Sequence, residues 1–165
     1  MTAFSDVYDA FFNKMEEDSD FFDYFNLTRS QAMEVAKERA HSYLKEAIAV
    51  IERRMEVDDT ADFMDCDDET ARFNWDLSID EIDMLASFMY EQYFKRQYSK
   101  LKAFDMQHVP STLQVFSPAN ERKTVRNMLS DMHEENMTML DNYMAKDRVT
   151  RKFKTLDYDD LSSDD

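Results

Sequence analysis

The chain has 165 residues, no glycine, two prolines and a formal net charge of −16. Without glycine it can form neither a P-loop nor a G-x-G-x-x-G turn, because both need backbone with positive φ or a very close approach to phosphate. The net charge makes nucleic acid and anionic lipid unfavourable partners. The one cysteine, Cys66, excludes an intramolecular disulfide and a multi-cysteine zinc site, which is typical of a reducing compartment.

Length and hydrophobic content favour one domain over two, since 43% of the residues are hydrophobic. No apolar run approaches the roughly 18 residues of a membrane span, and the first residues lack the basic start of a signal peptide. We therefore expect a soluble intracellular product. With so little glycine and proline, its fold class should be all-α, a helical bundle of about four helices joined by polar loops.

The first predicted helix runs from about Ala3 to Met15, because apolar residues recur along it at helical spacing. A polar break follows, and then a dense aromatic patch over residues 21–25 that we expect to close one end of the core. The apolar stripe of this helix consists of Phe4, Val7, Tyr8, Phe11 and Phe12.

The second predicted helix begins after Thr28 and continues to about Arg54. Thr28 and Gln31 have the spacing of a capping box, in which each side chain satisfies the other residue's backbone N–H. The predicted core-facing stripe consists of Met33, Ala36, Ala40, Leu44, Ala47 and Ile51.

Residues 56–69 hold eight acidic side chains and no basic one, which is half of the net charge. So many like charges on adjacent turns would repel one another in a helix, so we expect an exposed acidic loop. Its candidate functional residues are Asp58, Asp59, Asp62, Asp65, Asp67, Asp68 and Glu69.

The third predicted helix has the clearest start in the sequence. Ser78 and Glu81 form a second capping box, and Leu77 is placed to contact Ile82 across it. We expect the helix to run from Ile79 to about Leu101.

Residues 102–116 contain Pro110 and a β-prone run at 112–116, which predicts an extended connection with room for a small strand. Ser117 and Pro118 then mark the start of a fourth helix that reaches about Lys146. Its predicted seam, able to pack in a bundle or against another subunit, consists of Val125, Leu129, Met132, Asn136, Met139 and Tyr143.

The end of the chain has two halves of opposite charge. Residues 146–154 hold five basic and one acidic side chain, and residues 157–165 hold five acidic and no basic one. This composition predicts a helical domain over residues 1–146 and an extended docking tail over residues 147–165.

The residues that could carry chemistry do not assemble into a recognised catalytic or metal site. Glu38-x-x-His41 and Asp105-x-x-His108 have the spacing of di-iron ligands, but Glu38 projects away from its helix's apolar stripe. His133 lacks a second histidine four residues on, and the carboxylates around Cys66 disfavour its thiolate. We therefore expect no enzyme, no metal and no cofactor. The 13 methionines suit either core filling or an adaptable interaction surface.

Four motifs in one order resemble a known family. They are DVYDAFFNK at residues 6–14, YLKEAI at 43–48, FNWDLSIDEI at 73–82 and FSPANER at 116–122. In this order they resemble the head-to-tail connector proteins of tailed bacteriophages, also called adaptor or head-completion proteins. The resemblance covers roughly residues 4–143.

The resemblance implies a virion protein of the phage neck that is made in the host cytoplasm. It implies a ring, usually of about twelve copies, beneath the portal protein. Such a ring would complete the head, extend the DNA channel and dock the next neck or tail protein, while DNA passes through without specific binding and no membrane is involved.

Two hypotheses about surfaces follow. The acidic loop would face the channel or the ring surface, where it would not reward binding of DNA phosphate. The basic part of the tail would dock on an acidic groove of the portal protein, through Arg148, Arg151, Lys152, Phe153 and Lys154.

An alternative function is an acidic, phage-encoded inhibitor that mimics DNA and occupies the basic groove of a host DNA-binding protein. The net charge of −16 and the small size suit it. The clustering of carboxylates in one loop argues against it, since a mimic needs them spaced along a face.

Overall fold

The computed structural model describes residues 1–15, 21–22, 24, 26–55, 62–108 and 118–154, with side chains from 101 to 122 outside the description. It is a mostly helical bundle of four helices with one very small sheet. The helices are α1 (Phe4–Lys14), α2 (Arg29–Glu52), α3 (Ile79–His108) and α4 (Pro118–Met144). The expected all-α bundle is therefore confirmed.

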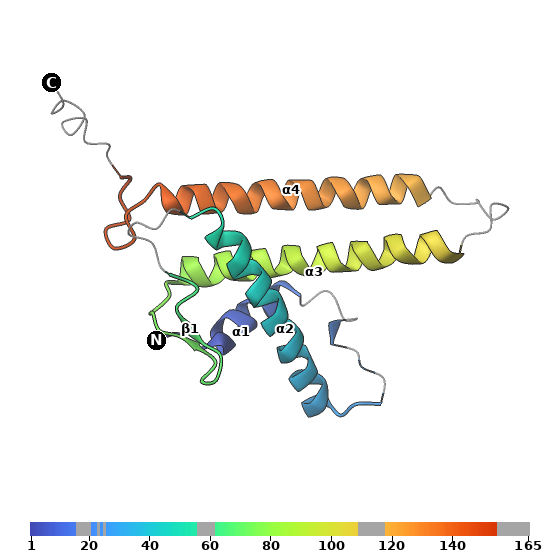
Figure 1. Ribbon diagram of the computed structural model, residues 1–165, viewed down its shortest axis with the longest axis horizontal. Helices are drawn as coiled ribbons and strands as arrows, with labels where there is room; N and C mark the ends of the chain where they lie inside the picture. Colours follow the sequence, from blue (N-terminus) through green and yellow to red (C-terminus); the bar gives the residue numbers. More distant parts are fainter. Residues whose placement is uncertain (16–20, 23, 25, 56–61, 109–117, 155–165) are drawn as a thin grey trace, which may run out of the picture.

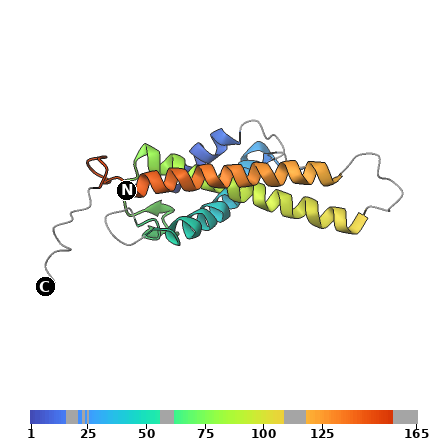
Figure 2. The ribbon, with the colours of Figure 1, turned by 90° about the horizontal axis from the view of Figure 1, so that it is seen from above.

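Helix α3 is the centre of the bundle and contacts each of the other three helices. α1 and α2 pack on its first half, so that its second half and the adjoining part of α4 extend beyond them (Figure 1). α3 and α4 lie side by side in both views (Figure 2). The fold therefore combines a compact end with a two-helix arm.

The core of the compact end is rich in aromatic rings. Phe21 is fully buried and meets Phe11 and Tyr93 edge to face, with ring centroids 5.6 and 5.5 Å apart. Arg39 covers the outer face of Phe21 at 4.3 Å and donates to its carbonyl oxygen. Each such ring pair stabilises by about 0.5–1.5 kcal/mol beyond burial. Phe21 therefore fills the core as the aromatic patch predicts, while Phe25 lies outside the described residues.

Both predicted capping boxes are present. The Thr28 hydroxyl accepts from the Gln31 N–H and the Gln31 side chain accepts from the Thr28 N–H, so that α2 starts at Arg29. The Ser78 and Glu81 pair repeats this exchange at the start of α3. Helix starts are set by local side chains, which is why the sequence located them.

One predicted boundary is wrong. α3 continues to His108, so residues 102–108 are helical rather than extended. The stretch from Lys100 to Ala103 favours helix, and the first residue that disfavours it is Val109, which precedes Pro110. The predicted strand at residues 112–116 lies outside the described residues.

The predicted helix faces also need correction. Met33, expected to face the core, is 39% exposed. On α4 the seam residues Val125, Leu129 and Met132 are only half-buried. Tight packing of α4 is concentrated at Asn136 and Leu140.

Residues 62–69, the described part of the predicted acidic loop, are mostly exposed as expected, but they belong to a hairpin instead of an irregular loop. Strand β1 (Cys66–Asp67) pairs antiparallel with β2 (Arg72–Phe73), and Cys66 lies opposite Phe73. Phe63 and Phe73 are fully buried beneath this hairpin. The N-terminus adds a third extended segment, since the Phe73 N–H donates to the Thr2 carbonyl at 2.8 Å. The hairpin thus closes the core at the start of α1.

Candidate functional site

The basic segment that follows α4 is folded, not extended. Residues 145–154, here called the basic loop, close on themselves through backbone bonds from Lys154 N–H to the Ala145 carbonyl and from Asp147 N–H to the Lys152 carbonyl, at 2.9 and 2.8 Å. The Asp147 carboxylate accepts from the Thr150 N–H at 2.6 Å, inside the turn. The expectation of an extended tail is therefore wrong for residues 147–154, and residues 155–165 lie outside the described residues.

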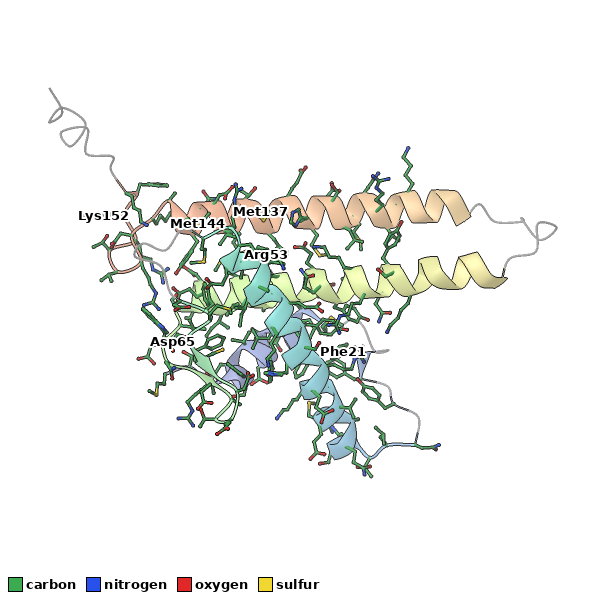
Figure 3. The ribbon with its side chains drawn as sticks, viewed as in Figure 1. Phe21, Arg53, Asp65, Met137, Met144 and Lys152 are labelled. Atoms are coloured by element: carbon green, nitrogen blue, oxygen red, sulfur yellow. The ribbon has the colours of Figure 1, made fainter. Side chains whose placement is uncertain are left out.

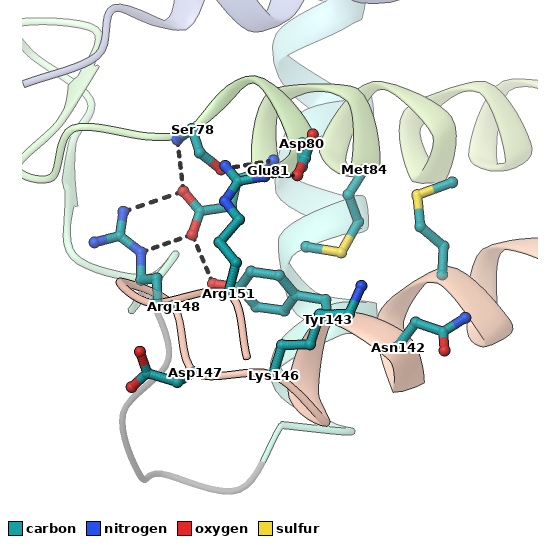
Figure 4. Close-up of a pocket in the computed structure, with 11 residues that line it drawn as sticks. Ser78, Asp80, Glu81, Met84, Asn142, Tyr143, Lys146, Asp147, Arg148 and Arg151 are labelled. Carbon is teal, nitrogen blue, oxygen red and sulfur yellow. Dashed lines mark hydrogen bonds and ion pairs between the residues drawn. The ribbon is translucent and has the colours of Figure 1, made fainter. Parts of the chain in front are cut away.

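Arg148 fastens the basic loop to the start of α3. Its Nε donates to Oε1 of Glu81 at 2.7 Å, and its Nη2 donates to Oε2 of Glu81 at 3.1 Å and to the Asp76 carbonyl at 2.7 Å (Figure 4). The guanidinium also lies over the Trp75 ring, 5.4 Å from its centroid. Arg148 is thus committed to bonds within the chain and is not available as a docking residue.

The Glu81 side chain that receives Arg148 is fully buried. Tyr143 donates to Oε1 at 2.6 Å and the Ser78 N–H donates to Oε2 at 2.7 Å. Burial raises the pKa of Glu81, but the hydrogen bonds from Arg148, Tyr143 and Ser78 outweigh it, so that the pKa lies below its usual range. Glu81 therefore joins three elements as a carboxylate: the start of α3, the end of α4 and the basic loop.

The other four predicted docking residues remain on the surface. Arg151 pairs with Asp80 on the outside of α3, and both side chains are exposed. Lys152 and Lys154 are exposed, and Phe153 is 68% exposed. Figure 3 places Lys152 beyond Met144, at the end of the molecule. Arg148 therefore holds the loop from within while these residues face outward.

Val149, which the sequence reasoning missed, is 87% exposed on the same loop. A single valine among basic residues gives no periodic signal, so no sequence pattern could have found it. With Phe153 it gives the basic loop an apolar part as well as a charged one. Exposed apolar side chains grouped on one feature are typical of an interaction site.

A cavity of about 270 Å³ lies between the basic loop and α3. Lys146 and Arg151 face it from the loop side, and Asp80 and Glu81 face it from α3. Its opposite charges are balanced by one another, so this cavity favours neither an anion nor a cation. The cavity is the space left where the basic loop packs against α3.

The acidic residues of the predicted loop mostly organise the hairpin. Asp62 accepts from the Met64 N–H at 2.9 Å, and Asp65 accepts from Asn74 and Trp75 at 2.6 and 3.0 Å. Asp58 and Asp59 lie outside the described residues, and Glu69 is exposed. These carboxylates satisfy nearby donors, which the count of like charges could not indicate.

Asp67 and Asp68 hold the hairpin turn and its contact with α2. Thr70 donates to Asp67 at 2.7 Å, and the pKa of Asp67 is lowered mainly by that bond. Lys45 on α2 lies 2.5 Å from Asp68, and its hydrogen bond lowers the pKa of that carboxyl. Both carboxylates therefore have a structural use in the described part of the chain.

A second buried carboxylate joins α3 to α4. Glu91 is fully buried and accepts from Asn136 at 2.7 Å, while Nδ1 of His133 and Nζ of Lys95 lie 2.8 and 2.6 Å from it. Burial raises the pKa of Glu91, and these three partners outweigh it and lower the pKa. The sequence around His133 gave no signal for this contact, because His133 and Asn136 lie 42 and 45 positions from Glu91.

Two of the remaining candidates for chemistry lie near Asp68: Nε2 of His41 is 3.6 Å from its carboxylate, and the charge of Asp68 also acts on Cys66. Burial, and next the charge of Asp68, raise the pKa of the Cys66 thiol, as its acidic surroundings suggested. Nδ1 of His41 lies 2.9 Å from the Tyr8 hydroxyl, and burial raises the pKa of Tyr8 to about 12. Within the described residues, no three His, Cys, Asp or Glu side chains are placed to hold a metal ion.

A search for membrane spans among the described residues found no helix both long and apolar enough. A scan against protein-family models, a search of curated proteins and a search of solved structures each returned no match.

Proposed function

We propose that this chain is a structural protein of the bacteriophage neck, which forms a ring beneath the portal protein, extends the DNA channel and docks the next neck or tail component. The order of its four motifs and its helical bundle fold support this proposal. In this role the chain acts by assembly with other proteins.

The observation that carries the proposal is the way the basic loop is presented. A buried arginine–glutamate pair fixes its base, while Lys152, Phe153 and Lys154 face outward at one end of the molecule. A pre-formed loop loses little conformational freedom on binding, which favours affinity. Because it is basic, it selects an acidic surface on its partner.

The charge of the rest of the chain fits a channel through which DNA slides. DNA binding is driven largely by neutralisation of phosphates with lysine and arginine, and a chain with a net charge of −16 offers little of it. The alternative of a DNA mimic receives less support, because Asp62, Asp65, Asp67 and Asp68 are occupied by donors of the chain itself.

The proposal is tested by attachment to capsids that carry the portal. The variant Arg151→Glu, Lys152→Glu, Lys154→Glu should no longer sediment with them, while the wild type should. The matched control is Arg29→Glu, Lys37→Glu, Arg53→Glu, which makes the same change of charge at exposed positions of α2 and its end. Equal attachment of both variants would contradict docking through the basic loop.

A further inference from the structure

A long groove runs between α3 and α4, on the side where the end of α1 meets them. Its volume is about 760 Å³, within the range of roughly 300–1,000 Å³ typical of binding pockets. Its α4 wall reaches from Thr124 to Met139, and Lys14 of α1 lies at its other wall. Its lining includes Tyr90 of α3 and Met128, Asp131, Met132 and Glu135 of α4.

The floor and sides of the groove are apolar but adaptable. Met128, Met132 and Met139 line it from α4, opposite Tyr90 of α3. Met128 is 39% exposed, so its side chain is accessible from outside. Methionine side chains repack readily around an incoming apolar group, so the groove suits a protein side chain better than a rigid small molecule.

The charges of the groove are acidic. Asp131 and Glu135 stand one turn apart on its α4 wall and are exposed. Among the described residues neither has an ion-pair partner, whereas Lys14 at the other wall is paired with Asp83 at 2.7 Å. The groove therefore fits an occupant that combines apolar side chains with positive charge.

The basic loop has this combination. Val149 and Phe153 are its exposed apolar side chains, and Lys152 and Lys154 flank Phe153. The loop cannot enter the groove of its own chain, because Arg148 fastens it to Glu81 and Asp76.

We infer that the basic loop of one copy binds in the α3–α4 groove of a second copy. Phe153 and Val149 enter among the methionines, and Lys152 and Lys154 pair with Asp131 and Glu135. This contact joins two different surfaces, so it repeats head to tail and closes into a ring when the rotation permits. The inference rests on the proposed ring and names the neighbouring copy as the loop's partner, so that the loop supports attachment to the portal by closing the ring.

The contact is tested by disulfide trapping in a Cys66→Ser background. Met132→Cys combined with Phe153→Cys should give a ladder of crosslinked dimers, trimers and higher forms on mild oxidation. The control combines Phe153→Cys with Met33→Cys, because Met33 lies at an exposed position of α2 away from the groove. Absence of the ladder, or the same ladder in the control, would overturn the inference.

Charge reversal sharpens the test. Lys152→Glu with Lys154→Glu, and separately Asp131→Lys with Glu135→Lys, should each reduce the ladder about tenfold or more, because like charges then face each other. All four changes in one chain should restore it. Circular dichroism confirms that each variant is folded.

The two proposals fail differently. If the loop variant loses capsid attachment while the groove variant keeps it and the ladder is absent, the portal is the loop's partner and the head-to-tail contact is wrong. If the wild type does not attach to capsids while the ladder behaves as expected, the neck function is wrong and the self-association stands.

Discussion

At the scale of single residues, two glutamates of α3 do more than their sequence context indicates. Glu81 was predictable as a capping residue, because its partner Ser78 is three positions away. Its second role was not, because Arg148 lies 67 positions along the chain and only the folded structure brings them together. Local hydrogen bonds can be predicted from spacing, whereas a buried ion pair depends on the packing of whole helices.

Loss of the Arg148 side chain should be costly. Arg148→Met leaves the carboxylate of Glu81 buried without its cation, which typically costs about 3–5 kcal/mol of unfolding free energy. Arg151→Met removes an exposed pair with Asp80 and should cost less than about 1 kcal/mol. Urea denaturation measures the unfolding free energy of both variants. Similar losses would contradict the conclusion that Arg148 fastens the basic loop to α3.

Acid should weaken the fold through the buried carboxylates of Glu81 and Glu91. Their folded pKa values lie below the unfolded value of about 4.3, so their stabilisation is present above that pH and is lost as the pH falls through the folded pKa. Unfolding free energy measured from pH 7 to pH 3 should fall, and should fall less steeply in Glu81→Gln. A wild type whose stability rises on acidification would show that the sign is wrong.

At the scale of elements, the helices were predictable and the hairpin was not. Capping boxes and apolar stripes located the starts of α2 and α3, because these signals are local. The hairpin strands have only two residues each, too few for an alternating pattern, and the acidic side chains around them indicated a solvated loop. The proposed docking surface could be predicted only in part. Its basic residues have a sequence signal, but Val149 and the α3–α4 groove do not.

The turn of the hairpin carries backbone strain that glycine would relieve. Ala71 has φ of 52°, in the left-handed region that a side chain disfavours. Ala71→Gly should therefore raise the unfolding free energy by about 1 kcal/mol, measured by thermal denaturation. Ala49→Gly, in the last turn of α2, should lower it by up to about 1 kcal/mol, because glycine disfavours helix. Destabilisation by both changes would show that the turn is not strained.

At the scale of the whole molecule, the subunit is asymmetric. The compact end is held by aromatic packing and bears the basic loop. The acidic groove lies between α3 and α4. The sequence placed a domain boundary at residue 146, yet the loop is packed against α3 as far as Arg151. Such complementary surfaces on opposite parts of a subunit suit a ring.

The central claim is that the chain completes the neck of a phage particle. Electron micrographs of negatively stained particles from a phage lacking this gene test it directly. We expect full heads without tails that leak their DNA. The wild-type chain should restore tailed particles, whereas the Arg151→Glu, Lys152→Glu, Lys154→Glu variant should not. Tailed, intact particles in the deletion would contradict it.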